Sequence, residues 1–224
     1  ETQLAFVDIA GLVRGASKGE GLGNQFLANI RETDAIVHVL RCFEDGDITH
    51  VEGKVDPIAD AETVETELML ADLESLEKRV PNLLKKGAQG DKEAKAAASV
   101  LGQTLELLRD GKPARLTQPR DDEEARLFAQ AQLLTAKPVL YVCNVEEGAA
   151  AQGNAHSARV FEKAAAENAS AVIVSAAIEA ELVTMPVEER GEYLEALGLT
   201  EAGLARIIRA GYELLGLITF FTVG

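Results

Sequence analysis

The sequence contains little cysteine, which restricts the kinds of site that the chain can build. Only Cys42 and Cys143 occur among 224 residues, each near the end of an apolar run. We therefore expect two buried thiols rather than a disulfide, as in a protein of the reducing cytoplasm. No cluster of cysteine and histidine has the spacing of a zinc site.

Long apolar runs are also absent. No segment approaches the ~20 apolar residues that cross a bilayer. The N-terminus shows no basic leader followed by an apolar stretch and a cleavage site. These absences predict a cytoplasmic protein with no membrane partner.

A third absence concerns phosphate binding. The phosphate-loop pattern G-x-x-x-x-G-K-[ST] does not occur in this chain. The two Gly-Lys pairs, Gly53-Lys54 and Gly111-Lys112, have no glycine five residues before the Gly, and neither is followed by Ser or Thr. We therefore expect this chain by itself to bind a nucleoside triphosphate weakly or not at all.

Basic residues are outnumbered, since 22 Lys and Arg face 37 Asp and Glu for a net charge of −15. This balance argues against a protein that coats nucleic acid with its whole surface. Lys78 to Lys95 is an exception, with six basic residues against two acidic ones, so that it carries +4 and the remainder −19. This segment is either a solvated tip of a helical hairpin or a basic surface for an acidic partner such as RNA.

Apolar strands alternate with amphipathic helices along the chain, which predicts an α/β fold around a parallel sheet. From about residue 61 the pattern becomes helical and charged, and Gly87 and Gly90 interrupt it, which predicts an inserted α-helical hairpin followed by a shorter helix. Thr200 is the expected N-cap of the last helix, which ends near Leu215. Strands are expected at 4–7, 35–40, 138–143, 171–175 and 217–223, and the other helices at 22–33, 61–86, 91–109, 121–134, 156–168 and 179–197.

The first candidate motif follows the first expected strand. Asp8 ends that strand and Gly11 comes three residues later, in a segment where five glycines fall between Gly11 and Gly23. In phosphate-handling α/β proteins such an aspartate holds Mg²⁺, usually through water, and the glycine amide approaches a terminal phosphate. The alternative is a strand, a flexible turn and a helix without a ligand.

Two later strand ends carry a second candidate site. The strand at 138–143 runs into Asn144-Val145-Glu146-Glu147, and the strand at 171–175 ends in Ser175-Ala176-Ala177. GTPases place N-K-x-D and S-A-[KL] at the corresponding loops, where they hold the guanine base. The order of three strand-end motifs favours a nucleotide site over three ordinary loops.

These motifs resemble one family. Residues 8–16 and 19–24 look like the switch II region of the Obg-related P-loop NTPases, and residues 42–45, 48–51 and 55–57 narrow the resemblance to the YchF (Obg-like ATPase) family. Residues 144–147 and 217–224 match that family too, so the resemblance covers essentially the whole chain.

The resemblance implies a cytoplasmic, ribosome-binding ATPase that uses ATP and Mg²⁺. It implies a P-loop NTPase-like G domain in two parts, 1–60 and 137–215, a helical coiled-coil insertion at 61–136, and the start of a truncated TGS domain at 216–224. The chain would then be the middle of a longer protein whose phosphate loop lies before residue 1. A non-catalytic ribosome or RNA interaction module and an Obg-type GTPase are the alternatives.

Base choice and water positioning are further expectations. Glu147 is one methylene longer than the aspartate of guanine-specific loops and Val145 replaces their lysine, so we expect ATP, with Asn144 on the adenine edge and Val145 on the ring. Leu12 stands where Ras-type enzymes carry a water-positioning glutamine. His50 is our candidate for that role, the alternative being a loop histidine bonded to backbone groups.

Overall fold

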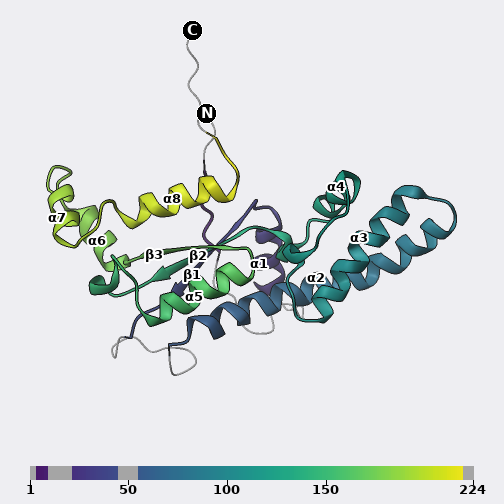
Figure 1. Ribbon diagram of the computed structural model, residues 1–224, viewed down its shortest axis with the longest axis horizontal. Coiled ribbons are helices and arrows are strands. Elements are labelled where there is room, and N and C mark those ends of the chain that lie inside the picture. Colours follow the sequence, from purple (N-terminus) through teal and green to yellow (C-terminus); the bar gives the residue numbers. More distant parts are fainter. Residues whose placement is uncertain (1–3, 10–21, 45–54, 219–224) are drawn as a thin grey trace, which may run out of the picture. The chain divides into compact units, whose positions relative to one another are not determined.

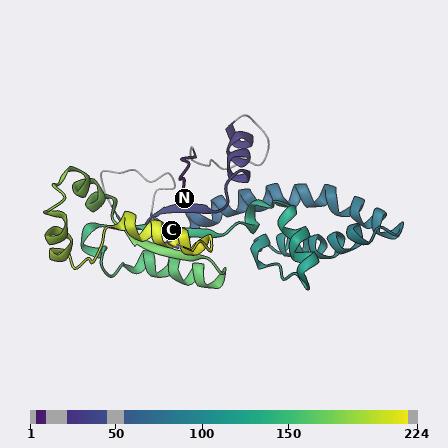
Figure 2. The same ribbon diagram turned by 90° about the horizontal axis from the view of Figure 1, so that it is seen from above.

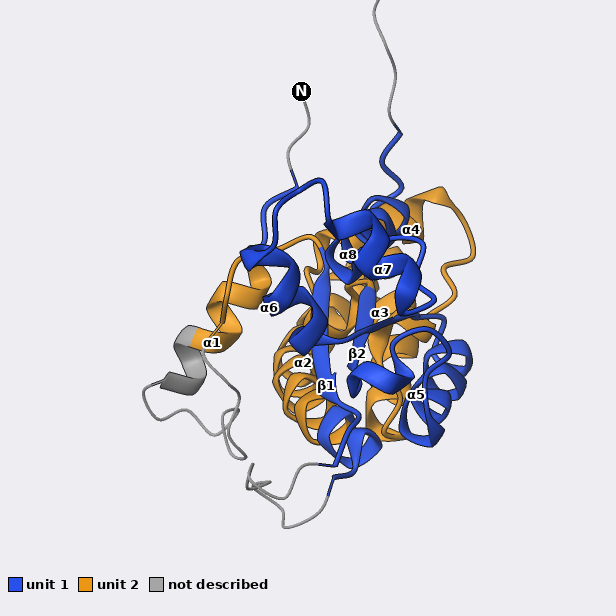
Figure 3. Ribbon diagram, turned by 90° about the vertical axis from the view of Figure 1, so that its left-hand side faces the viewer, with its two compact units in different colours: residues 1–6, 35–61, 139–224 blue, residues 7–34, 62–138 orange. Residues whose placement is uncertain are grey.

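The computed structural model describes residues 4–9, 22–44 and 55–218. The chain divides into two compact units, each described here by itself (Figure 3). Unit 1 comprises residues 1–6, 35–61 and 139–224, and unit 2 comprises residues 7–34 and 62–138.

Unit 1 is built on a parallel sheet of three described strands in the order β1-β2-β3 (Figure 1). The strands are β1 (Ile36–Arg41), β2 (Val139–Asn144) and β3 (Ser170–Val174). Ile36 pairs with Val139, and Leu140 pairs with Ser170. All three strands were expected within about one residue of these bounds, and the α/β fold with a parallel sheet is confirmed.

Successive side chains of β2 point to opposite sides of the sheet, and helices cover both faces. Tyr141 and Cys143 pack with Val160 of α5 (Ala155–Ala166). On the other face, Leu140 and Val142 pack with α8 (Gly203–Leu214) through Ile207, Ala210 and Leu214. β2 is buried on both faces, as its continuous apolar run predicts.

Two short helices follow β3. They are α6 (Ala176–Thr184) and α7 (Arg190–Ala196), so the expected helix at 179–197 is interrupted near Pro186 as predicted. Ile178 and Leu182 of α6 form a small core with Ala150 and Leu199.

The expected strand at residues 4–7 is wrong. Residues 4–9 have no regular structure, and the side chains of Phe6 and Val7 are exposed. A strand needs a neighbouring strand for its backbone hydrogen bonds, and none of the three described strands pairs with this segment. Leu4 instead packs against α8, where a Cβ on Gly211 would come within 3.0 Å of its side chain.

The predicted N-cap of the last helix is also wrong. The cap residue of α8 is Ala202, whose side chain cannot accept a hydrogen bond, rather than Thr200. The carboxylate of Glu179 in α6 caps the helix instead, because it accepts hydrogen bonds from the backbone N–H groups of Gly203 (2.6 Å) and Leu204 (3.1 Å). A negative group at this end also suits the helix dipole.

Unit 2 contains the predicted helical hairpin (Figures 1 and 2). Its arms are α2 (Pro57–Ala88), whose first residues belong to unit 1, and α3 (Lys92–Arg109). Asp91 caps α3 by accepting from the N–H of Ala94 at 3.0 Å. Leu76 and Val80 of α2 pack against Val100 and four other apolar residues of α3, namely Ala97, Leu101, Leu105 and Leu108.

The remaining elements of unit 2 are shorter. They are α1 (Leu22–Arg31), the 3₁₀ turns η2 (Ala114–Leu116) and η3 (Leu134–Ala136), and α4 (Asp122–Gln130). In unit 1, a third 3₁₀ turn, η4 (Glu147–Ala149), follows β2. Among the described helices, none is both long and apolar enough to span a bilayer.

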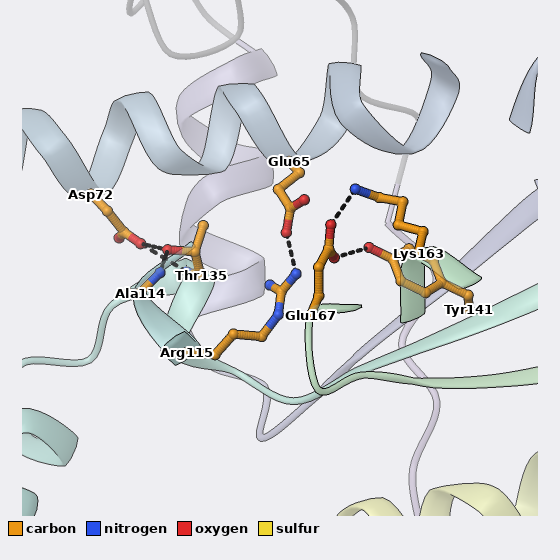
Figure 4. A network of polar contacts seen from close by, with 8 residues as sticks. All are labelled: Glu65, Asp72, Ala114, Arg115, Thr135, Tyr141, Lys163 and Glu167. Atoms are coloured by element: carbon orange, nitrogen blue, oxygen red, sulfur yellow. Dashed lines mark hydrogen bonds and ion pairs between the residues drawn. The ribbon is translucent and has the colours of Figure 1, made fainter. Parts of the chain in front are cut away.

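A buried carboxylate ties α2 to the turns of unit 2 (Figure 4). Asp72 accepts from the backbone N–H groups of Leu134 and Thr135, both at 2.8 Å, and from the Thr135 hydroxyl at 2.7 Å. Thr135 Oγ1 also accepts from the N–H of Ala114 at 3.0 Å. Burial raises the pKa of Asp72 although these hydrogen bonds act to lower it.

His38 makes the stability of unit 1 depend on pH. Its ring lies 5.9 Å from that of Tyr141. Burial lowers its pKa from 6.5 to about 4, with a smaller opposing effect of the charge of Asp60 and a further lowering by that of Lys163. Well above pH 6.5 the histidine is neutral in both states and has no effect. As the pH falls from 6.5 to 4 the unfolded chain binds the proton first, so folding should lose up to about 3 kcal/mol.

Urea unfolding of wild type and His38→Leu at pH 7 and pH 5 measures this effect. The wild type should lose more stability than the variant between the two pH values. Equal losses of unfolding free energy in the two proteins would contradict the assignment of this pH dependence to His38.

Candidate functional site

The two predicted base loops meet at the carboxyl end of the sheet. Asn144, the last residue of β2, accepts a hydrogen bond at Oδ1 from the backbone N–H of Ala176 at 2.9 Å. The N–H of Val145 donates to the carbonyl of Val174 at 2.9 Å, which extends the pairing of β2 and β3 into the loops. No described residue accepts from the Asn144 side-chain amide, so this group is available to a ligand.

Ser175 lies between β3 and α6 with its hydroxyl buried. It is the N-cap residue of α6 but makes no capping hydrogen bond. Its Oγ has no hydrogen-bond partner among the described residues. Ala176 and Ala177 follow it and are exposed. An unpartnered buried hydroxyl beside two exposed small residues is compatible with a ligand at this loop.

Val145 and Glu147 differ in their surroundings. Val145 is only 2% exposed and packs in the core with Leu40, Cys42 and Tyr141. Its predicted contact with a base would therefore require the loop to move, and the assignment stays a prediction. Glu147 is exposed at the start of η4, where its carboxylate can reach a ligand.

The predicted phosphate-side residues are only partly described. Asp8 is exposed and belongs to unit 2. Gly11 and His50 lie outside the described residues. Within the described ranges, no group of three or more His, Cys, Asp or Glu side chains is placed to hold a metal ion. A lone exposed carboxylate nevertheless suits Mg²⁺ that keeps most of its water and phosphate ligands.

Asn154, near the base loops, was not predicted from the sequence. Asn154 donates from Nδ2 to the carbonyl of Cys42 at 2.6 Å and to Glu146 Oε2 at 2.9 Å. Its Oδ1 accepts from the N–H of Ser157 at 3.0 Å and thereby caps α5. The available signal was an asparagine three residues before a serine at a helix start, which is a capping pattern.

Curated relatives match the chain along its whole length. A family model described as "50S ribosome-binding GTPase" matches residues 1–72. The Ribosome-binding ATPase YchF of Haemophilus influenzae is 52% identical over 223 residues, and that of Bacillus subtilis is 49% identical over 225 residues. Each alignment covers 100% of this chain and 61% of the relative, so the chain spans about three fifths of their length.

A solved structure has the same fold. The YchF GTPase of Schizosaccharomyces pombe matches with a TM-score of 0.79 and 35% identity. That match covers 96% of this chain and 59% of the other.

Proposed function

We propose, for a chain that belongs to the YchF family of ribosome-binding ATPases, that the protein is a nucleotide-dependent switch. It would bind and hydrolyse ATP and associate with ribosomes. The observation that carries the proposal is the joining of Asn144 to Ala176, which brings the two base loops together at one edge of the sheet. Relatives at 49–52% identity bear the name ribosome-binding ATPase, which supports the same activity.

The domain assignment is part of the proposal. Residues 1–60 and 137–215 would form the G domain, 61–136 the helical insertion and 216–224 the start of a TGS domain. The relatives are longer than this chain, which supports placing it within a longer protein that supplies a phosphate loop. The protein would act in the cytoplasm, where ribosomes are.

The nucleotide is proposed to be ATP. Asn144 can donate its free amide to the N7 edge of adenine. Glu147 begins a 3₁₀ turn, and because it is one methylene longer than a guanine-binding aspartate it would not sit where guanine needs a carboxylate. Ser175, Ala176 and Ala177 would line the other side of the base.

Hydrolysis would depend on the residues predicted for the phosphate side. Asp8 would hold Mg²⁺ and Gly11 would approach the terminal phosphate, which Mg²⁺ would help to neutralise when bound. His50 would orient the attacking water because Leu12 cannot. These roles rest on the family resemblance and the sequence motifs.

Competition binding and turnover on the full-length protein test the proposal. ATP should displace a labelled nucleotide at lower concentration than GTP, and His50→Ala should slow turnover with little change in ATP affinity. The present chain alone should bind ATP weakly or not at all by calorimetry, because it has no phosphate-loop pattern. Preference for GTP would favour the Obg-type GTPase, and nucleotide-independent ribosome binding would favour the non-catalytic module.

The hairpin tip is the proposed ribosome contact. Four exposed lysines, Lys85, Lys86, Lys92 and Lys95, surround the turn between α2 and α3. Lys78 differs because it pairs with Glu74 at 2.6 Å, and Arg79 donates to the carbonyl of Ala131. Exposed cations of this kind suit the phosphates of ribosomal RNA.

Removing charge from the tip should weaken ribosome binding. We expect Lys85→Ala with Lys92→Ala to reduce co-sedimentation with ribosomes severalfold and to lessen its dependence on salt. The control is Lys112→Ala with Arg209→Ala, which removes the same charge from exposed positions elsewhere. Equal effects of the two pairs would argue against a contact at the tip.

A further inference from the structure

Asn154 joins three segments that are separate in sequence. Its Nδ2 group bonds the carbonyl of Cys42, directly after β1, and the carboxylate of Glu146, in the loop after β2. Its Oδ1 caps α5, and the N–H of Asn154 itself donates to Ser157 Oγ at 2.8 Å. The side chain therefore uses both of its polar atoms, and its position is fixed from three directions.

The turn that presents Asn154 is tightly packed. Gly153 has a φ of +78°, a conformation that side chains rarely adopt. A Cβ at this position would come within 2.5 Å of Ser157 Oγ and 2.8 Å of Ile173 Cδ1. The backbone that carries Asn154 thus has little freedom to shift.

Glu146 and Glu147 differ in their neighbours. Glu146 has an extended backbone, with φ −61° and ψ 156°, and its carboxylate accepts a hydrogen bond from Asn154 at the start of α5. Glu147 begins the 3₁₀ turn η4 and is exposed. The loop is therefore held through Glu146, while the side chain of Glu147 stays open to a ligand.

We propose that Asn154 and Glu146 are positioning residues for the nucleobase loop. This inference rests on the proposed nucleotide function. The loop is anchored at one end by the bond from Ala176 to Asn144 and at the other by the bond from Asn154 to Glu146. Two anchors hold Asn144 and Glu147 in the geometry that a base requires before the base arrives, which lowers the entropic cost of binding.

The variants are chosen to separate this role from helix capping. Serine is a good N-cap residue, so Asn154→Ser keeps the cap of α5 and removes only the Nδ2 donor. Glu146→Ala removes the acceptor from an exposed position, and Glu146→Gln retains an oxygen that can accept. Glu195→Ala, at an exposed position of α7, is the control.

The experiment measures binding of ATP and of inorganic tripolyphosphate to the full-length protein, together with kcat. Asn154→Ser and Glu146→Ala should each weaken ATP binding about tenfold, as expected for one lost hydrogen bond. Tripolyphosphate binding and kcat at saturation should be unchanged in both variants, and the unfolding midpoint should be unchanged in Glu146→Ala. The double variant should be no weaker than either single variant, and Glu146→Gln and the control should bind like wild type.

The outcomes distinguish this inference from the proposed function. Unaltered ATP affinity in both variants, or equal losses for ATP and tripolyphosphate, would overturn the positioning role alone. Failure of the wild-type protein to bind ATP would overturn the proposed function and this inference with it.

Discussion

Replacing Asp72 with alanine should destabilise the chain by about 3–5 kcal/mol, one of the two largest effects that we predict. The carboxylate is 2% exposed and accepts three hydrogen bonds. Its removal leaves the N–H groups of Leu134 and Thr135 buried without an acceptor. Urea unfolding followed by helical circular dichroism measures the loss.

Two further variants make this test specific. Asp72→Asn keeps the volume and one acceptor oxygen, so it should lose only part of that stability. Glu74→Ala removes a carboxylate two residues along the same helix, where it pairs with Lys78 at a largely exposed position, and should change stability little. If Asp72→Ala and Glu74→Ala lower the free energy of unfolding equally, the buried hydrogen bonds of Asp72 do not stabilise the fold measurably.

The second large effect concerns Asn144. In the full-length protein, Asn144→Ala should weaken ATP binding roughly 100-fold, because it removes both the bond to Ala176 and the amide offered to the base. Competition binding against a labelled nucleotide measures the change.

Asn144→Asp divides the two contributions. Aspartate keeps an oxygen that can accept from the N–H of Ala176 but loses the amide donor. This variant should therefore retain thermal stability and still bind ATP poorly. Asn82→Ala, at an exposed position of α2, is the control. If Asn144→Ala binds ATP with wild-type affinity, Asn144 does not belong to the nucleotide site.

The regular elements were predictable because their signals are local. The apolar run at β2 and the periodic leucines of α2 and α3 each identify an element without any knowledge of its neighbours. Gly87 and Gly90 likewise place the turn of the hairpin. The base loops were predictable for a related reason, since the ends of adjacent parallel strands must lie side by side.

Contacts between distant segments were not predictable. The bond from Asn154 to the carbonyl of Cys42 joins residues 112 apart in the sequence. Glu179 caps α8 from 24 residues away, and no sequence pattern near Ala202 predicts this cap. The sequence gives one weak indication that Asp72 is buried, namely its position beside Ala71 on the inward face of α2. The segment at 4–7 has a strand-like composition, but composition cannot supply a partner strand.

The pairing of β1 with β2 has a consequence for biosynthesis. Ile36 finds its partner in Val139, so the first strand emerges from the ribosome more than a hundred residues before the second. At typical rates of translation this interval is roughly 5–20 s. The hairpin arms of unit 2 lie entirely within the interval and pack through contacts between nearby helices. Nascent β1 must therefore wait for β2 while the hairpin becomes available to fold.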